Sequence, residues 1–338
     1  MIRYALPLLL LASAPAACAQ TPVQGPATLT TQDACDSHEA FALIVHGGTS
    51  SGEARPERLA FIEAMLSEQR AALAGGAQAL DVVEAAIVAM EDSALFNAGR
   101  ASITNRDGFV ETDASIMDGR DLDAGAVASQ LRLKNPIRAA RLVMENTRHV
   151  MMVGDRGERA VTELGAETVD PDTYFTRAKP KGEPKEHGTV GAAVLDRCGD
   201  LAAGTSTGGY DSKIPGRVGD SPNIGAGVYA KNGVMAGSAT GHGEYFIRHT
   251  ALRSVAARME HGGETLEAAS RAVVEEMQDA AAPGSGDGTG GVVVVDATGN
   301  FAHPHTTVGM IHGMTSHTLA PTASQNGNGD GNRLDRAD

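Results

Sequence analysis

Apolar positions along the chain first form short continuous runs and then recur with helical spacing. The run Phe41–Val45 predicts a buried strand, and Gly47 after it allows a tight backbone turn. Two amphipathic helices are predicted next, because apolar residues recur on one face of each. The two faces consist of Leu59, Ile62, Leu66 and Leu73, and of Val82, Val83, Ala86, Ile87 and Met90. Both stripes indicate helices that pack on a core.

Shorter elements are expected in the next part of the chain. The pattern predicts strands at Ala101–Thr104, Phe109–Asp113 and Asp123–Ser129, and helices at Ile137–Arg148 and Asp155–Leu164. The segment 170–188 then breaks the pattern. It is polar, contains prolines and has no periodicity, which predicts a solvated, mobile linker.

The C-terminal half is rich in predicted strands that flank glycine-containing turns. Its expected strands are Thr189–Asp196, Leu201–Gly208, Gly225–Ala230, Val234–Thr240, Gly291–Asp296 and Thr307–His312, its helices are Glu244–His261 and Thr265–Ala280, and its tail from Ser316 is expected to be disordered. Helices in two separate pairs with strands between them suggest two packed sheets with helices outside.

Composition narrows the class of protein. The 338 residues contain 42% hydrophobic residues, no Trp and 4% aromatics, so the core is built mainly from aliphatic side chains and Met. This size is compatible with one domain. The formal charge of −14 repels phosphate backbones and anionic lipid, which argues against nucleic-acid and membrane partners and leaves a small polar substrate.

Residues 1–19 have the pattern of a secretory signal. Arg3 precedes an apolar run, and Ala17-Cys18-Ala19 fits a small-residue cleavage site before Gln20. The pattern predicts a periplasmic or secreted protein, with a lipoprotein through Cys18 as the alternative. Removal of the signal leaves Cys35 and Cys198, which either pair in an oxidising compartment or stay as thiols.

The junction Gly188-Thr189 lies where the polar linker meets a predicted central strand. If the bond between them is opened, Thr189 gains an α-amino group with a pKa of about 7.7–8 beside its own hydroxyl. One residue then supplies nucleophile and base. The same hydroxyl can make the cut by attacking the Gly188 carbonyl, and glycine permits the strained backbone that this attack requires. The alternative is that the pair merely begins a strand.

Other residues in the second half could complete such a site. If a three-residue loop joins the predicted strands Thr189–Asp196 and Leu201–Gly208, Thr207 lies opposite Thr189, about 5 Å away. A bulge at Gly199 would instead shift this register by one residue. Arg217 and Asp220 carry the charges complementary to an α-amino acid, or else form a local ion pair on a surface loop. Thr240-Gly241 leads from a strand into a helix, where a hydroxyl and a free N–H can receive an oxyanion.

Taken in order, several long motifs resemble the plant-type asparaginase and isoaspartyl peptidase family of N-terminal nucleophile hydrolases. They are Val45-His-Gly-Gly48, Leu95-Phe-Asn-Ala-Gly99, Asp113-Ala-Ser-Ile-Met-Asp-Gly119, His187-Gly-Thr-Val-Gly191, Thr205-Ser-Thr-Gly-Gly209, Gly216-Arg-Val-Gly-Asp-Ser-Pro222 and Thr240-Gly-His-Gly-Glu244. The likeness covers residues 41–312. His242 in the last motif and His303-Pro304-His305 are departures that bear on substrate preference.

The resemblance implies an α+β fold, a four-layer αββα sandwich, cut into an α chain of 20–188 and a β chain of 189–338. It implies Thr189 as nucleophile with Thr207 as hydroxyl partner, and an oxyanion site at Thr240 and Gly241. By the same resemblance, Arg217, Asp220 and Gly243 bind the substrate's α-carboxylate and α-amino groups, and Asn97 lies beside the nucleophile.

The resemblance also implies that no cofactor is required, with a structural sodium ion as an option in the loop before Asn97, and that two αβ units form a homodimer. None of the eleven histidines has metal-ligand spacing. The predicted activity is hydrolysis of β-aspartyl dipeptides and L-asparagine to release L-aspartate. The alternatives are a glycosylasparaginase of the same fold and an inactive, exported amino-acid-binding relative.

Overall fold

A computed structural model describes residues 40–50, 56–176, 188–280, 288–325 and 332–334. The predicted signal peptide and the residues immediately before Gly188 lie outside these ranges. Within them the chain is a mixed α and β structure with an eight-stranded and a four-stranded sheet.

The larger sheet has the strand order β12-β11-β1-β5-β6-β2-β3-β4. Its strands are β1 (Ala42–Ser50), β2 (Thr112–Asp118), β3 (Ala124–Gln130), β4 (Met151–Val153), β5 (Val190–Leu195), β6 (Leu201–Thr207), β11 (Gly309–Ser316) and β12 (Thr322–Ser324). The smaller sheet, in the order β10-β9-β8-β7, consists of β7 (Val228–Lys231), β8 (Met235–Gly241), β9 (Gly290–Asp296) and β10 (Phe301–Ala302).

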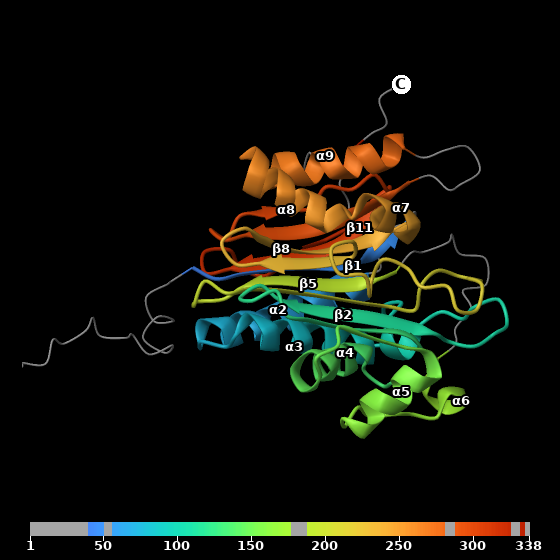
Figure 1. The fold of residues 1–338 in the computed structure, drawn as a ribbon. Helices are drawn as coiled ribbons and strands as arrows, with labels where there is room; N and C mark the ends of the chain where they lie inside the picture. Colours follow the sequence, from blue (N-terminus) through green and yellow to red (C-terminus); the bar gives the residue numbers. More distant parts are fainter. Residues whose placement is uncertain (1–39, 51–55, 177–187, 281–287, 326–331, 335–338) are drawn as a thin grey trace, which may run out of the picture.

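Helices pack against the outer side of each sheet (Figure 1). Beside the larger sheet lie α2 (Pro56–Ala74), α3 (Ala79–Asp92), α4 (Pro136–Asn146), α5 (Gly154–Glu163) and the short α6 (Pro171–Tyr174). Beside the smaller sheet lie α7 (Gly243–His249), α8 (Ala251–Gly262) and α9 (Leu266–Asp279). The two sheets contact each other directly, β5 and β6 against β7 and β8.

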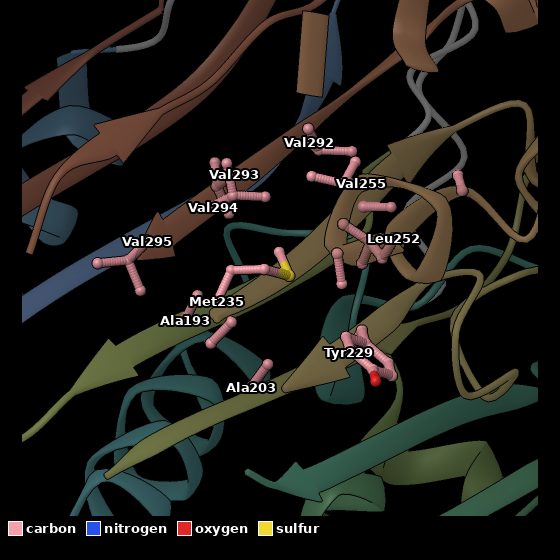
Figure 2. Close-up of a cluster of buried hydrophobic side chains, with 14 of the residues drawn as sticks. Ala193, Ala203, Tyr229, Met235, Leu252, Val255, Val292, Val293, Val294 and Val295 are labelled. Atoms are coloured by element: carbon pink, nitrogen blue, oxygen red, sulfur yellow. The ribbon is translucent and has the colours of Figure 1, made fainter. Parts of the chain in front are cut away.

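The alternation of side chains along β5 joins the two hydrophobic cores. Val190, Ala192 and Val194 face the core shared with α2–α4, whereas Ala193 and Leu195 face the core between the sheets. Ala193 belongs to the same buried cluster as Met235 of β8 and Val292–Val295 of β9, which Figure 2 shows. Because the period is two, Thr189 at the start of β5 also faces the space between the sheets.

The hairpin register predicted from the turn is confirmed. Val190 pairs with Ser206 and Gly191 with Thr205, so a one-residue shift at Gly199 does not occur. Gly199 instead takes a φ of 81° in the three-residue loop that follows Asp196, a conformation that glycine adopts without strain. Thr189 and Thr207 are therefore neighbours across the two strands.

Two sequence predictions were wrong in detail. The strand expected at Ala101–Thr104 is a 3₁₀ turn, Gly99–Ala101, with one isolated bridge from Thr104 to Val110. The single helix expected over Glu244–His261 is divided into α7 and α8 by Thr250, which has a left-handed φ of 45°. Local apolar spacing continues through such a break, so the pattern did not reveal it.

The two segments expected to lack structure are also partly ordered. Asp170 caps α6 by accepting a hydrogen bond from Asp172 N, so 170–176 is not linker, whereas 177–187 lies outside the described residues. After Ser316 the chain turns back and Thr322 of β12 pairs with Met314 of β11. Backbone hydrogen bonding to a neighbouring strand thus orders a polar segment that has little core of its own.

Candidate active site

Thr189 is the residue around which the predicted site assembles. It lies directly before β5, is buried with 7% of its surface exposed, and donates a hydrogen bond from Oγ1 to Thr207 Oγ1 at 3.1 Å. Thr207 Oγ1 also accepts a hydrogen bond from Gly209 N at 2.9 Å. The second hydroxyl is therefore fixed by the backbone that follows β6, and it holds the first in one orientation.

A buried polar chain between the sheets holds the backbone of Thr189. His46 Nδ1 lies 3.0 Å from the Thr189 carbonyl oxygen, and His46 Nε2 lies 2.8 Å from Ser238 Oγ on β8. Burial lowers the pKa of His46 to about 3, so the ring is neutral. Since a carbonyl only accepts, Nδ1 carries the proton and Nε2 accepts from Ser238. Neither His46 nor Ser238 was singled out from the sequence as part of the site.

Asn97, which the resemblance implies lies beside the nucleophile, contacts the segment that follows β6. Its Nδ2 donates to Gly209 O at 2.6 Å, and its Oδ1 accepts from Ile103 N at 2.9 Å. A Cβ atom on Gly188 would lie 2.8 Å from Asn97 Cβ, and one on Gly208 would lie 2.5 Å from Asn97 Oδ1. Asn97 therefore packs against both the predicted cleavage position and the loop that fixes Thr207.

Arg217, Asp220 and Gly243 form a second group. A Cβ atom on Gly243 would lie 2.5 Å from Asp220 Oδ1 and 3.0 Å from Arg217 Nη2, so glycine is the residue that fits there. Glu244 binds the Arg217 guanidinium through two hydrogen bonds, of 3.0 and 2.9 Å, and Tyr210 lies under it with its ring centre 4.4 Å from Cζ. These contacts hold the planar guanidinium, and therefore its N–H donors, in one orientation.

Asp220 is the more unusual member of this group. Burial raises the pKa of its carboxyl to about 7, against the opposing effect of Arg217. Its Oδ2 has no hydrogen-bond partner among the described residues. A buried carboxylate oxygen without a partner is costly, and an ammonium group would satisfy it.

Thr240 and Gly241 lie at the end of β8. Thr240 is fully buried and shares a face of β8 with Ser238, which contacts His46 across the sheets. Gly241 has a φ of 139°, and a Cβ atom on it would lie 2.4 Å from Gly290 Cα. The structure thus places Thr240 on the strand face that meets the larger sheet, and the next residue, Gly241, against the β9 backbone.

Asp113 lies between the group around Thr189 and Thr207 and the group around Arg217 and Asp220. The sequence placed Asp113 in a motif but assigned it no role. It pairs with Thr207 across β2 and β6, and burial raises the pKa of its carboxyl. Lys213, also buried, donates from Nζ to Glu111 O at 2.8 Å, and a Cβ atom on Gly209 would lie 2.9 Å from that Nζ. Lys213 could not be distinguished from a surface lysine by sequence pattern, because its partners are distant in the chain.

Three observations bear on ions and membranes. Near the loop expected to offer a sodium site, Phe96 O accepts a hydrogen bond from Ala98 N and Asn97 O accepts one from Gly208 N. In the described part of the chain, one cluster has metal-ligand proximity, Asp196 with Cys198 and Asp200, but Cys198 is disulfide-bonded. No helix within the described residues has the length and apolarity needed to cross a bilayer.

Comparisons with known proteins agree on one family. A family model described as Asparaginase matches residues 39–182 and 177–323. An isoaspartyl peptidase of Escherichia coli K12 is 42% identical over 296 residues, which cover 79% of this chain and 90% of that protein. A human isoaspartyl peptidase/L-asparaginase is 38% identical over 288 residues, 79% of this chain and 91% of that protein. A zebrafish (Danio rerio) protein of the same name is 39% identical, covering 77% of this chain and 87% of its own length.

Proposed function

The chain belongs to the asparaginase family, and from that premise we propose that it is a self-processing isoaspartyl peptidase and L-asparaginase with Thr189 as its nucleophile. The observation that carries the proposal is the hydroxyl pair of Thr189 and Thr207, 3.1 Å apart between the sheets and directly after Gly188. Relatives with about 40% identity over most of the chain bear names for this activity.

Self-processing begins with the Thr189 hydroxyl. Its Oγ1 attacks the Gly188 carbonyl carbon, and the peptide nitrogen leaves with the proton, so that an ester replaces the amide. Water then hydrolyses the ester, which returns the hydroxyl and leaves Thr189 with a free α-amino group. Thr207 supports the attack, because its Oγ1 accepts a hydrogen bond from the Thr189 hydroxyl in the uncut chain and so orients it.

The new amino group then acts as the base for the second reaction. It removes the proton from Oγ1, which attacks the side-chain carbonyl carbon of a β-aspartyl substrate. Thr240 Oγ1 and Gly241 N–H stabilise the negative charge on the carbonyl oxygen. The leaving amine departs with the proton, and water hydrolyses the aspartyl ester to release L-aspartate.

Substrate recognition follows from the charges of the second group. Arg217 binds the α-carboxylate, Asp220 accepts hydrogen bonds from the α-ammonium group, and the absence of a side chain at Gly243 leaves room between them. The Arg217–Glu244 pair is already formed, so a carboxylate ligand either shares the guanidinium or displaces Glu244. In both cases Glu244 holds the Arg217 guanidinium in a fixed orientation before the substrate binds.

The proposal extends to architecture and location. The two sheets with helices outside correspond to a four-layer αββα sandwich, and cleavage before Thr189 divides it into the α and β chains. Residues 1–19 direct export to the periplasm or the exterior, and a disulfide at Cys198 suits an oxidising compartment. Two αβ units assemble as a homodimer, which size-exclusion chromatography with light scattering would test.

A reducing, denaturing gel and N-terminal sequencing test the processing step. Wild-type protein should separate into two fragments of similar size, one of which begins at Thr189. Thr189→Ala should stay whole, and Thr189→Ser, which retains a hydroxyl, should still be cut. Wild-type protein that remains a single chain after long incubation would refute self-processing.

A side-by-side assay tests the substrate class. An isoaspartyl dipeptide and L-asparagine should both be hydrolysed, and glycosylasparagine should be hydrolysed poorly. A clear preference for glycosylasparagine would instead assign the chain to the glycosylasparaginases. Activity in a Thr189→Ala preparation would show that a contaminating enzyme, or another residue, is responsible.

A further inference from the structure

Cys198 is disulfide-bonded, and it lies in the turn between β5 and β6. The turn is rigid, because Asp196 Oδ1 accepts hydrogen bonds from Cys198 N at 2.8 Å and from Asp200 N at 3.0 Å. Asp196 Oδ2 accepts a third from Ala79 N at 2.8 Å, which fixes the turn against the start of α3. The sulfur atom is therefore held at a defined position on the far end of the hairpin from Thr189.

The identity of its partner follows from the cysteine count and the strand pairing. The chain contains three cysteines, and the other two are Cys18 and Cys35. Ala42, the first residue of β1, pairs with Leu195, three positions before Cys198. The N-terminal end of β1 thus lies beside the end of β5 that leads into the Cys198 turn.

Chain length is compatible with Cys35. Residues 36–41 can span about 20 Å, and the segment from Leu195 to Cys198 spans at most about 10 Å. A disulfide needs Cα atoms about 5.5 Å apart, which is well within this reach. Cys18 lies within the proposed signal peptide, which export would remove.

We propose that Cys198 pairs with Cys35, and that this disulfide joins the α and β chains covalently once the bond before Thr189 has been cut. The inference rests on the proposed function, because only the cut turns an internal bond into a link between chains. Cys35 and Cys18 both precede Gly188, and Cys198 follows it. The bond therefore bridges the cut whichever of them is the partner.

The bond forms by thiol–disulfide exchange with a disulfide oxidant of the exported compartment. One thiolate of the pair attacks the oxidant's disulfide, and the second thiolate then displaces the oxidant from the mixed disulfide. The two cysteines lose two protons and two electrons, and the oxidant gains them as a dithiol. A disulfide there would leave the chemistry at Thr189 untouched, since the six residues of β5 separate the two positions by about 20 Å.

The β-sheet already holds the two chains together under native conditions. Strand β1 of the α chain lies between β5 and β11 of the β chain, and β2 pairs with β6. The covalent link consequently becomes visible only when the fold is denatured. This makes a denaturing gel the direct test.

Full-length protein is expressed with its own N-terminal segment into an oxidising periplasm, its thiols are blocked with iodoacetamide, and it is run with and without reductant. Wild type should run as one band of uncut size without reductant and as two fragments with it. Cys198→Ser and Cys35→Ser should give two fragments in both lanes, and the matched control Cys18→Ser should behave as wild type. Two wild-type fragments without reductant, or a band of twice the uncut size, would overturn the proposal.

The reduced lane separates this proposal from the proposed function. One band in both lanes means that self-processing has failed, and the disulfide is then decided by mass spectrometry of a non-reduced digest. A peptide pair that joins Cys35 to Cys198 supports the assignment. A pair that joins Cys18 to Cys198, or an alkylated Cys198 thiol, contradicts it.

Discussion

Burial of the Asp220 carboxyl group should make substrate binding depend on pH. Its pKa is raised to about 7, so it gains a proton as the pH falls through neutrality. A neutral carboxyl cannot attract the substrate's ammonium group with the strength of an ion pair. We therefore expect KM for L-asparagine to rise as the pH falls below about 7.

The substitution Asp220→Asn should remove this behaviour. A charge-assisted hydrogen bond contributes about 1.5–3 kcal/mol, so KM should increase about tenfold to hundredfold at pH 8 and should vary little with pH. Asp211→Asn, a change of the same charge at an exposed position, is the control and should leave KM unchanged. Retention of the wild-type pH profile of KM by Asp220→Asn would exclude this assignment.

His46 acts on the nucleophile through the Thr189 backbone. Replacing it with Phe keeps a ring of similar shape but removes the bonds to Thr189 O and Ser238 Oγ. The carbonyl and the hydroxyl would then lose buried partners, and Thr189 would be less firmly positioned. We expect slower fragment formation and a lower kcat, each by about tenfold or more, in a folded protein.

The rate of self-cleavage measured on reducing gels, together with kcat, checks this prediction. His149→Phe, at an exposed position, is the control and should process at the wild-type rate. Circular dichroism establishes that each variant is folded. A fully folded His46→Phe with unchanged processing would show that the bond to Thr189 has no positioning role.

At the scale of elements, the close approach of β3 to α4 explains why a glycine is needed at position 125, which lies outside the candidate active site. A Cβ atom on Gly125 of β3 would lie 2.0 Å from Ala140 O and 2.7 Å from Met144 N, both in α4. These are backbone atoms of a helix and cannot move aside individually. Gly125→Ala should therefore push α4 from the sheet and cost about 1–3 kcal/mol or more in the free energy of unfolding.

Urea unfolding measures this cost. The measurement belongs in a Thr189→Ala background, where a single uncut chain keeps the transition unimolecular. Gly262→Ala is the matched control, because a Cβ atom there meets nothing nearer than 3.6 Å. Equal stabilities of the two variants would mean that β3 and α4 do not pack as closely as described.

At the scale of the whole molecule, Glu91 couples stability to pH. It is fully buried in α3, accepts hydrogen bonds from Ser206 Oγ at 2.6 Å and Ile137 N at 3.1 Å, and so links α3 to β6 and α4. Burial raises the pKa of its carboxyl to about 8. Between about pH 4.5 and 8 the folded state thus keeps a proton that the unfolded chain has lost.

The free energy of unfolding must then decrease as the pH rises through this window, by up to about 1.4 kcal/mol per pH unit for one proton. The side chain of Glu91→Gln cannot titrate. The free energy of unfolding of this variant should therefore depend on pH with a slope smaller by about one proton than that of its parent, when both carry Thr189→Ala. Glu145→Gln, at an exposed position, should keep the parental slope. Identical slopes for Glu91→Gln and the parent would show that Glu91 is ionised in the folded protein.

Local pattern was enough to predict most elements and part of the site. The apolar stripes of α2 and α3 and the alternation of β5 and β6 reflect side-chain periods that are properties of consecutive residues. The turn after Asp196 likewise set the register that brings Thr189 to Thr207. Thr250 escaped prediction, because its left-handed conformation leaves the apolar spacing around it intact.

The sequence by itself determined the order of the motifs, the reactive residue types and the periodicity that builds two sheets with helices beside them. Only the tertiary structure decided which distant groups meet. His46 and Ser238 are 192 positions apart, and Lys213 and Glu111 are 102 positions apart, yet each pair is in hydrogen-bond contact. The physical reason is that burial, pKa and partner choice depend on how the sheets pack, and no local period records that packing.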